Sequence, residues 1–239
     1  MEPGDSWRLE AVAVVHSPYR ERFGIPRQPG LVPEVTGEVR LLPPYDDPAM
    51  VRGLAEFSHI WLTFVFDRCV DRGWRALVRP PRLGGNRSVG VWASRSPFRP
   101  NFIGLSAVRL LEVVEHPRPL LRVSGMDLLD GTPVLDIKPY LPYADSLPDA
   151  VGGFAPQAPP ARLPVRFCAA AESHLAATAD PEGLRRLVTA VLALDPRPAY
   201  RQGPEPERLY GMRLDAFEVR WSVDADGVEV RALEPAGPE

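Results

Sequence analysis

Three aspartates and the only lysine of the chain lie within one short stretch, from Asp127 to Lys138. Alternate residues of a strand face the same side, so Asp136 and Lys138 would share a face as a carboxylate and ammonium pair. Asp127 and Asp130 bracket the turn before it. A carboxylate held by a turn or strand can act as a general base, and a lone lysine indicates a compact point charge. Turn chemistry and an exposed ion pair worth roughly 0.2–1 kcal/mol explain the same residues without any function.

A second group of charges lies on a loop stiffened by proline, residues 94–104. Pro97 and Pro100 restrict their own backbone and that of the residues before them, so Arg95 and Arg99 would be presented by a segment with little freedom left to lose. Such ordering before contact favours binding. A solvated turn that contains two arginines is the simpler interpretation of the loop alone.

Positive charge is segregated in the sequence around this loop. Between residues 67 and 111 nine arginines stand against two aspartates, although the whole chain has a formal net charge of −3 and a pI near 5.9. A basic region in an acidic protein is typical of a surface that binds a polyanion such as nucleic acid. Aromatic residues that could stack on unpaired bases lie among these arginines, at Trp74, Trp92, Phe98 and Phe102.

A turn that could approach a ligand closely occurs at Gln28-Pro29-Gly30. Glycine allows a positive φ and glutamine offers an amide that both donates and accepts, although an ordinary type II turn explains the proline and glycine equally well. No metal site is expected, because the two cysteines form no CxxC motif and the four histidines have no ligand spacing.

The composition is that of a globular protein. The chain has 239 residues, 45% hydrophobic and 25% charged, with 29 prolines that indicate many turns. Two distant cysteines fit a reducing cytoplasm, and neither a signal peptide nor a membrane span is expected.

Alternation and apolar runs predict seven strands and few helices in the first part of the chain, which favours a barrel or a sandwich. Phe57 to Phe66 is almost entirely apolar, so we expect a strand buried on both faces. A short helix from Pro48 to Ala55 is expected, with Asp47 as its N-cap. The other expected strands are Leu9 to His16, Thr36 to Leu42, Ser88 to Ser94, Leu105 to Glu115, Leu120 to Met126 and Thr132 to Pro139.

A second domain is expected after a proline-rich linker at residues 154–164, so that the domains would cover residues 1–153 and 165–239. Its expected elements are strands at Leu163 to Ala169, Tyr210 to Val223 and Gly227 to Leu233, with a helix from Pro181 to Leu194. That is a small α+β unit. From the residues alone, the chain is an RNA- or nucleotide-binding β protein whose reaction remains open.

Several motifs resemble those of one enzyme family. They are Ser17-Pro18-Tyr19, Pro26 to Gly30, Phe57-Ser58-His59, Arg79 to Gly85, the loop from Arg95 to Gly104, Asp130 to Val134, Asp136 to Pro142 and Asp195 to Arg201. Together they span nearly the whole chain. The sequence resembles the TrmO (YaeB/TsaA-like) tRNA methyltransferases. The resemblance implies a class VIII, TsaA-like β-barrel that uses S-adenosylmethionine, forms a homodimer and methylates N6 of threonylcarbamoyladenosine at position 37 of threonine tRNAs.

The resemblance also implies site residues. The cofactor would lie against Gln28, Pro29, Gly30, Phe66, Asp67, Arg95, Leu105, Ser124, Gly125, Met126 and Asp127. Asp127 or Asp136 would accept the proton of the substrate nitrogen, while Arg95 or Lys138 would hold a substrate oxygen. Phosphates of tRNA would contact Arg75, Arg79, Arg82, Arg99, Arg197 and Arg201. The alternatives are a non-catalytic RNA-binding β-barrel module and a methyltransferase for another modified RNA or a small substrate.

Overall fold

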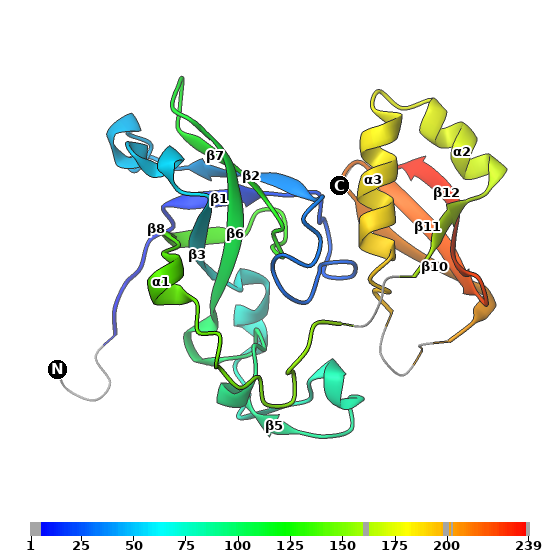
Figure 1. Cartoon of the computed structure of the whole chain (residues 1–239), viewed down its shortest axis with the longest axis horizontal. Helices are drawn as coiled ribbons and strands as arrows, with labels where there is room; N and C mark the ends of the chain where they lie inside the picture. Colours follow the sequence, from blue (N-terminus) through cyan, green and yellow to red (C-terminus); the bar gives the residue numbers. More distant parts are fainter. Residues whose placement is uncertain (1–5, 160–162, 198–200, 202, 238–239) are drawn as a thin grey trace.

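The computed structural model describes residues 6–159, 163–197, 201 and 203–237. It contains a closed β-barrel, a separate four-stranded sheet with helices, and an irregular excursion that leaves and re-enters the barrel (Figure 1). The mainly β architecture with a barrel and a smaller α+β C-terminal unit confirms the expected fold class. Within the described residues, no helix is long and apolar enough to cross a membrane.

Six strands form the barrel in the order β1-β2-β7-β6-β3-β8, and every neighbouring pair is antiparallel. The pairing of β8 with β1 closes it, so no edge strand is left to pair with another chain. The strands are β1 (Ala13–His16), β2 (Thr36–Leu41), β3 (His59–Val65), β6 (Ile103–Val114), β7 (Leu120–Ser124) and β8 (Pro133–Pro139).

The central strand β3 is buried on one face only. Ile60, Leu62 and Phe64 are buried in the barrel core, while the residues between them are partly exposed. The prediction of a strand buried on both faces was therefore wrong. In a closed antiparallel barrel one face of each strand points to the core, and here the apolar residues Trp61 and Val65 at outward positions obscured the alternation.

Gly104 on β6 pairs with Phe64 on β3, and the phenylalanine ring covers the glycine. A Cβ at position 104 would lie 2.3 Å from Cζ of Phe64, so the ring would have to move. We expect Gly104→Ala to lower the free energy of unfolding by about 1–3 kcal/mol, measured by urea denaturation. Gly90→Ala is the matched control, because a Cβ at position 90 meets nothing within 4 Å; equal losses in both variants would contradict this packing argument.

The excursion between β3 and β6 carries most of the arginine-rich region (Figure 1). It consists of 3₁₀ segments at Asp67–Arg72, Pro81–Leu83, Val91–Ala93 and Pro100–Phe102, and of a two-stranded ribbon formed by β4 (Leu77–Val78) and β5 (Val89–Gly90). The expected strand at Ser88 to Ser94 is therefore reduced to two residues. Only Val91 of this stretch is buried, and Trp92 is 72% exposed where the chain turns into the 3₁₀ segment.

Other helical segments near the barrel are short. The predicted helix from Pro48 to Ala55 is two 3₁₀ turns, Pro48–Val51 and Leu54–Glu56, separated by Gly53 with a φ of 82°. Asp47 caps the first as expected, since its carboxylate accepts a hydrogen bond from the Ala49 N–H at 2.8 Å. The helix α1 (Pro142–Asp145) follows β8.

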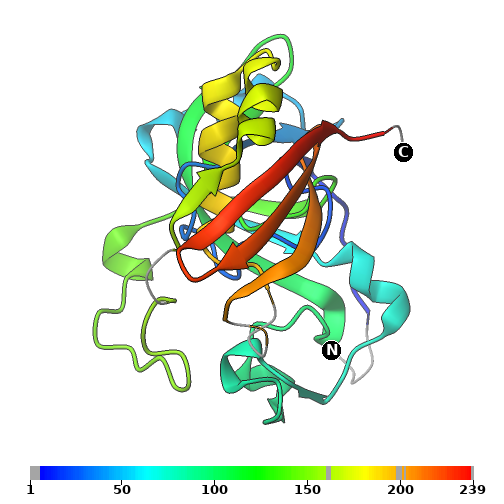
Figure 2. The same ribbon diagram turned by 90° about the vertical axis from the view of Figure 1, so that its right-hand side faces the viewer.

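The C-terminal unit is a sheet in the order β10-β11-β12-β9, whose long strands are seen in Figure 2 with the helices next to one another. Its elements are β9 (Val165–Phe167), α2 (Ala169–Ala176), α3 (Pro181–Leu192), β10 (Glu205–Leu214), β11 (Phe217–Asp224) and β12 (Gly227–Pro235). The stretch from Tyr210 to Val223 is a hairpin and not one strand, because Asp215 adopts a φ of 54° at its turn. Helix α2 was not predicted, since its alanine-rich sequence has almost no apolar periodicity. Residues 160–162 of the predicted linker lie outside the described residues.

The loop between β1 and β2 packs into the C-terminal unit. Tyr19, Val32 and Val35 belong to the same buried cluster as the core of α3 and β10 to β12. The ring of Phe23 stacks on that of Trp221 with centroids 5.8 Å apart. The hydrophobic core of the C-terminal unit is thus completed by a segment from the other end of the chain, and the two units form one structure.

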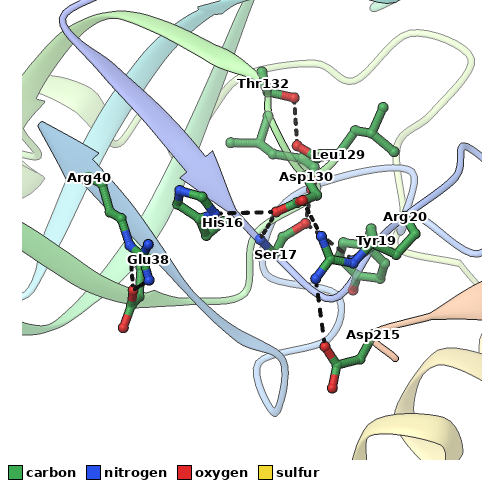
Figure 3. A network of polar contacts seen from close by, with 11 residues as sticks. His16, Ser17, Tyr19, Arg20, Glu38, Arg40, Leu129, Asp130, Thr132 and Asp215 are labelled. Atoms are coloured by element: carbon green, nitrogen blue, oxygen red, sulfur yellow. Dashed lines mark hydrogen bonds and ion pairs between the residues drawn. The ribbon is translucent and has the colours of Figure 1, made fainter. Parts of the chain in front are cut away.

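Polar contacts reinforce this joint (Figure 3). The carboxylate of Asp130 accepts a hydrogen bond from the Ser17 N–H at 3.0 Å and pairs with Arg20, which also lies 3.9 Å from Asp215 of the β10–β11 turn. The N–H of Asp215 donates to the carbonyl of Pro18 at 2.6 Å. Asp130 therefore has a structural task, and the turn interpretation of this residue is the better one.

Candidate active site

One end of the barrel is built from glycines in close contact. The N–H of Gly30 donates to the carbonyl of Gly125 at 2.7 Å, and the N–H of Gly125 donates to the carbonyl of Val35 at 3.0 Å. Both glycines have positive φ, 76° and 72°, and a Cβ on Gly125 would lie 3.3 Å from Cα of Gly30. The turn from Gln28 to Gly30 is therefore held against the end of β7 by backbone contacts that a larger residue would disturb.

Asp127 lies just beyond this contact and is the most perturbed carboxyl group of the site. It accepts a hydrogen bond from the hydroxyl of Ser106 at 2.7 Å. Burial raises the pKa of Asp127, whereas the Ser106 hydrogen bond and the positive charge of Arg95 act in the opposite direction. A half-buried carboxylate with few donors and a raised pKa is suited to accept a proton.

Arg95 connects the glycine turn to this carboxylate. Its guanidinium donates a hydrogen bond to the side-chain oxygen of Gln28, and its charge acts on Asp127. The stiff loop predicted around Arg95 is thus tied to the turn that follows β1. The structure brings Gln28, Arg95 and Asp127 together, although they lie far apart in the sequence.

The remaining predicted cofactor residues surround the same end of the barrel. Phe66 and Asp67 follow β3, and the N–H of Phe66 donates to the carbonyl of Phe102 at 2.8 Å. Leu105 on β6 is 54% exposed although it is large and apolar. Ser124 and Met126 are buried, so their side chains point into the protein. Only their backbone groups could contact a ligand at this end of the barrel.

Asp136 and Lys138 lie elsewhere. They pair with each other on β8, where their side chains are 47% and 68% exposed, and their strand partners on β3 are Thr63 and Trp61. Both are therefore on the outward face of the barrel, whereas Asp127 reaches the inward-facing Ser106. The structure does not bring these two residues to Asp127, and the simple strand ion pair explains them better than a catalytic role.

The arginines predicted to contact RNA fall into two groups. Two of those in the excursion lie over aromatic rings, Arg75 over Phe98 at 4.8 Å and Arg99 over Trp92 at 5.8 Å. Arg72, which was not among the predicted contacts, lies over the same ring of Phe98 at 4.9 Å. Arg79 and Arg82 are exposed, and Arg82 donates to the carbonyl of Gln157 at 2.6 Å.

Arg197 belongs to the other group, and its predicted RNA contact was wrong. It is 1% exposed and makes hydrogen bonds of 2.7 and 2.9 Å to the carboxylate of Asp195 and one of 2.8 Å to the carbonyl of Gly203. A guanidinium enclosed in this way cannot reach a phosphate. Arg201 is partly exposed and lies 3.6 Å from the Glu205 carboxylate.

Two residues of the site were not identified from the sequence as parts of it. Ser106 is a buried polar residue on the inward face of β6, between Gly104 and Val108. The sequence did carry one signal for Ser106: a polar residue occupies a position where the alternation of apolar residues predicts an inward-facing side chain. Tyr19, within the Ser17-Pro18-Tyr19 motif, is buried beside Asp127 in space, and no local pattern indicates that position.

Known proteins match this arrangement over nearly the whole chain. The model of the tRNA-methyltransferase O N-terminal domain matches residues 14–146, and that of the TrmO C-terminal domain matches residues 160–236. A tRNA (adenine(37)-N6)-methyltransferase of Escherichia coli is 51% identical over 233 residues, which cover 96% of this chain and 99% of that protein.

Further relatives agree. A putative S-adenosylmethionine-dependent methyltransferase of Pseudomonas aeruginosa is 47% identical over 231 residues, covering 96% of this chain and 97% of that protein. A crystal structure of TrmO from Pseudomonas aeruginosa superposes with a TM-score of 0.77 at 36% identity, over 98% of this chain and 100% of that one. Because both family models match in order and the relatives extend from end to end, this chain belongs to the tRNA-methyltransferase O family.

Proposed function

We propose that this protein methylates N6 of threonylcarbamoyladenosine at position 37 of threonine tRNAs, as a cytoplasmic homodimer. The coarser reaction rests on its family: it is an S-adenosylmethionine-dependent methyltransferase that acts on N6 of adenine 37 in tRNA. A non-catalytic RNA-binding module is therefore set aside. The observation that carries the proposal is the half-buried carboxylate of Asp127, with its raised pKa, close to the contact between Gly30 and Gly125.

The residues at this end of the barrel fit S-adenosylmethionine. The cofactor carries a sulfonium, an electrophilic methyl group and polar groups that need donors and acceptors. A carboxylate at Asp127 and the aromatic face of Phe66 suit a cation, and the amide of Gln28 can both donate and accept. The apolar surface of Leu105 is exposed at the same rim. We propose that these residues hold the cofactor with Pro29, Gly30, Asp67, Arg95 and the backbone of residues 124–126.

Asp127 is the proposed proton acceptor. The nitrogen to be methylated is acylated in the proposed substrate, so its lone pair is delocalised and its N–H is more acidic than that of an amine. Removing that proton restores a nucleophilic lone pair, and a half-buried carboxylate with a raised pKa is matched to the task. Arg95, which lies close enough for its charge to act on Asp127, is placed to hold the carboxylate or urea oxygen of the threonylcarbamoyl group.

The reaction is tested with labelled cofactor and two preparations of threonine tRNA, one carrying threonylcarbamoyladenosine and one lacking it. We expect label on that nucleoside alone, identified by nucleoside mass spectrometry. Equal methylation of both tRNAs would contradict the threonylcarbamoyl specificity. Methylation of neither, with cofactor binding intact, would favour a different modified RNA or a small substrate.

The excursion arginines are the proposed tRNA contacts. Replacing Arg79 with alanine should weaken tRNA binding and lower the slope of log K against log salt by about one unit, because one phosphate contact is lost. Filter binding between 50 and 200 mM salt measures this. Arg118→Ala is the control, since Arg118 lies in the β6–β7 connection at the opposite end of the barrel and is 75% exposed. An unchanged slope for Arg79→Ala, or an equal change for the control, would contradict the proposed surface.

A further inference from the structure

The hydroxyl of Tyr19 is a buried polar group with no hydrogen-bond partner among the described residues. The residue is 1% exposed and its ring packs in the cluster shared with the C-terminal unit. Buried polar groups are nearly always paired, and the exceptions mark an enclosed water, a ligand or a functional role. A phenylalanine would fill the same apolar space, so packing explains the ring of Tyr19 but not its oxygen.

Two acidic groups lie close enough for their charges to act on this hydroxyl, and the segment that carries Tyr19 runs beside residues 128–130, next to Asp127. Burial raises the pKa of Tyr19, and the negative charges of Asp127 and Glu34 raise it further. The phenol is therefore protonated at any working pH and can only act as a donor toward a carboxylate. Around Asp127 itself, Ser106 of β6 donates a hydrogen bond and Arg95 supplies positive charge from the excursion.

Both units of the protein fix the position of Tyr19. Its N–H donates to the hydroxyl of Ser17 at 3.2 Å, and its carbonyl accepts from the N–H of Asp130 at 2.9 Å. On the other side its backbone forms an isolated antiparallel bridge with Leu214 of β10. The backbone of Tyr19 is thus held from both sides and its ring is packed in the buried cluster, so the hydroxyl has little freedom to move in the folded protein.

We propose that Tyr19 is a positioning residue, whose hydroxyl donates to one enclosed water that in turn donates to the Asp127 carboxylate, and so keeps that carboxylate ionised and oriented for proton transfer. This inference rests on the proposed role of Asp127 as proton acceptor. It also gives the C-terminal unit a part in the chemistry, because that unit holds the ring of Tyr19 in place.

The test is the pH dependence of kcat/KM for Tyr19→Phe with cofactor and the tRNA substrate. A donor stabilises the charged carboxylate, so its loss should raise the pKa of Asp127 and move the acid limb of the profile upward by about one pH unit. Below that limb the rate should fall roughly tenfold, and above it the rate should recover. Tyr210→Phe is the matched control, because it removes a phenol hydroxyl from the same cluster that donates to Glu205. Its acid limb should stay in place.

Two outcomes would overturn the inference. If kcat/KM falls equally at every pH and the acid limb does not move, Tyr19 has a packing role only. If the pH profile of Tyr19→Phe is unchanged, the hydroxyl has no effect on the reaction. Incomplete folding of the variant would lower the rate at every pH without moving the acid limb. The position of the limb therefore remains a valid measurement even if part of the variant is unfolded. Asp127→Asn tests the premise separately. If that variant keeps full activity, Asp127 is not the proton acceptor. If it is inactive while the acid limb of Tyr19→Phe does not move, Asp127 keeps its role and only the role of Tyr19 is rejected.

Discussion

Replacing Asp127 with asparagine should lower kcat for methyl transfer by about 10²- to 10⁴-fold, the usual contribution of a positioned general base. The amide has nearly the same shape and can still receive the Ser106 hydrogen bond, so the fold should be kept. The affinity for S-adenosylmethionine should fall far less than kcat, because only one of the proposed contacts to the cofactor loses its charge. Single-turnover kinetics with saturating cofactor and tRNA measure the effect on chemistry, and isothermal titration calorimetry measures cofactor binding.

The wild-type profile should have its acid limb above the ordinary aspartate pKa of roughly 3.9. Burial raises the pKa of Asp127, and a base must be deprotonated to work, so activity is lost as the pH falls through that raised value. Asp136→Asn is the matched control: it removes a carboxylate that pairs with Lys138 on the outward face of β8. If the losses were reversed, with Asp136→Asn inactive and Asp127→Asn active, the proposed active site would be at the wrong place on the barrel.

Replacing Arg197 with alanine should lower the free energy of unfolding by about 3–5 kcal/mol, because it leaves a buried carboxylate without its partner. Asp195, whose side chain is 15% exposed, would lose hydrogen bonds from two guanidinium nitrogens, and the carbonyl of Gly203 would lose its donor. Urea denaturation followed by tryptophan fluorescence measures this, since Trp221 lies in the same buried cluster as the rest of the C-terminal core.

Arg79→Ala provides the contrast for this prediction. An exposed arginine of the excursion should change stability by no more than about 0.5 kcal/mol while it weakens tRNA binding. We therefore expect Arg197→Ala to lower stability without weakening tRNA binding, and Arg79→Ala to weaken tRNA binding without lowering stability. An Arg197→Ala protein of normal stability that binds tRNA poorly would show that this arginine contacts the nucleic acid after all.

The sequence by itself determined the elements whose signals are local. The strands from Thr36, Leu120 and Thr132 and the cap at Asp47 appear close to their expected places, because alternation, turn residues and side-chain caps act over a few residues. The segregation of nine arginines also marked the excursion before its shape was known. Motifs spread along the chain indicated the family and, with it, the barrel. Strand periodicity alone was compatible with either a barrel or a sandwich.

Tertiary structure decided what depends on distant neighbours. Ser88 to Ser94 alternates like a strand, yet it lies outside the barrel and pairs only through Val89 and Gly90, so it becomes a turn. Arg197 and Arg79 are the same residue type in the sequence, and only the enclosure of one by Asp195 and Gly203 separates a structural arginine from an exposed one.

The candidate site shows the same division most clearly. Asp127 and Asp136 are both plausible bases in one short stretch, but Asp127, in the connection after β7, reaches Ser106, whereas Asp136 lies on the outward face of β8 with Lys138. Burial raises the pKa of Asp127, while Ser106 of β6 and Arg95 of the excursion act in the opposite direction, and the fold brings these residues together from distant parts of the sequence. Local sequence sets which residues can ionise, whereas the solvent and charge around them, and therefore their chemistry, are set by the fold.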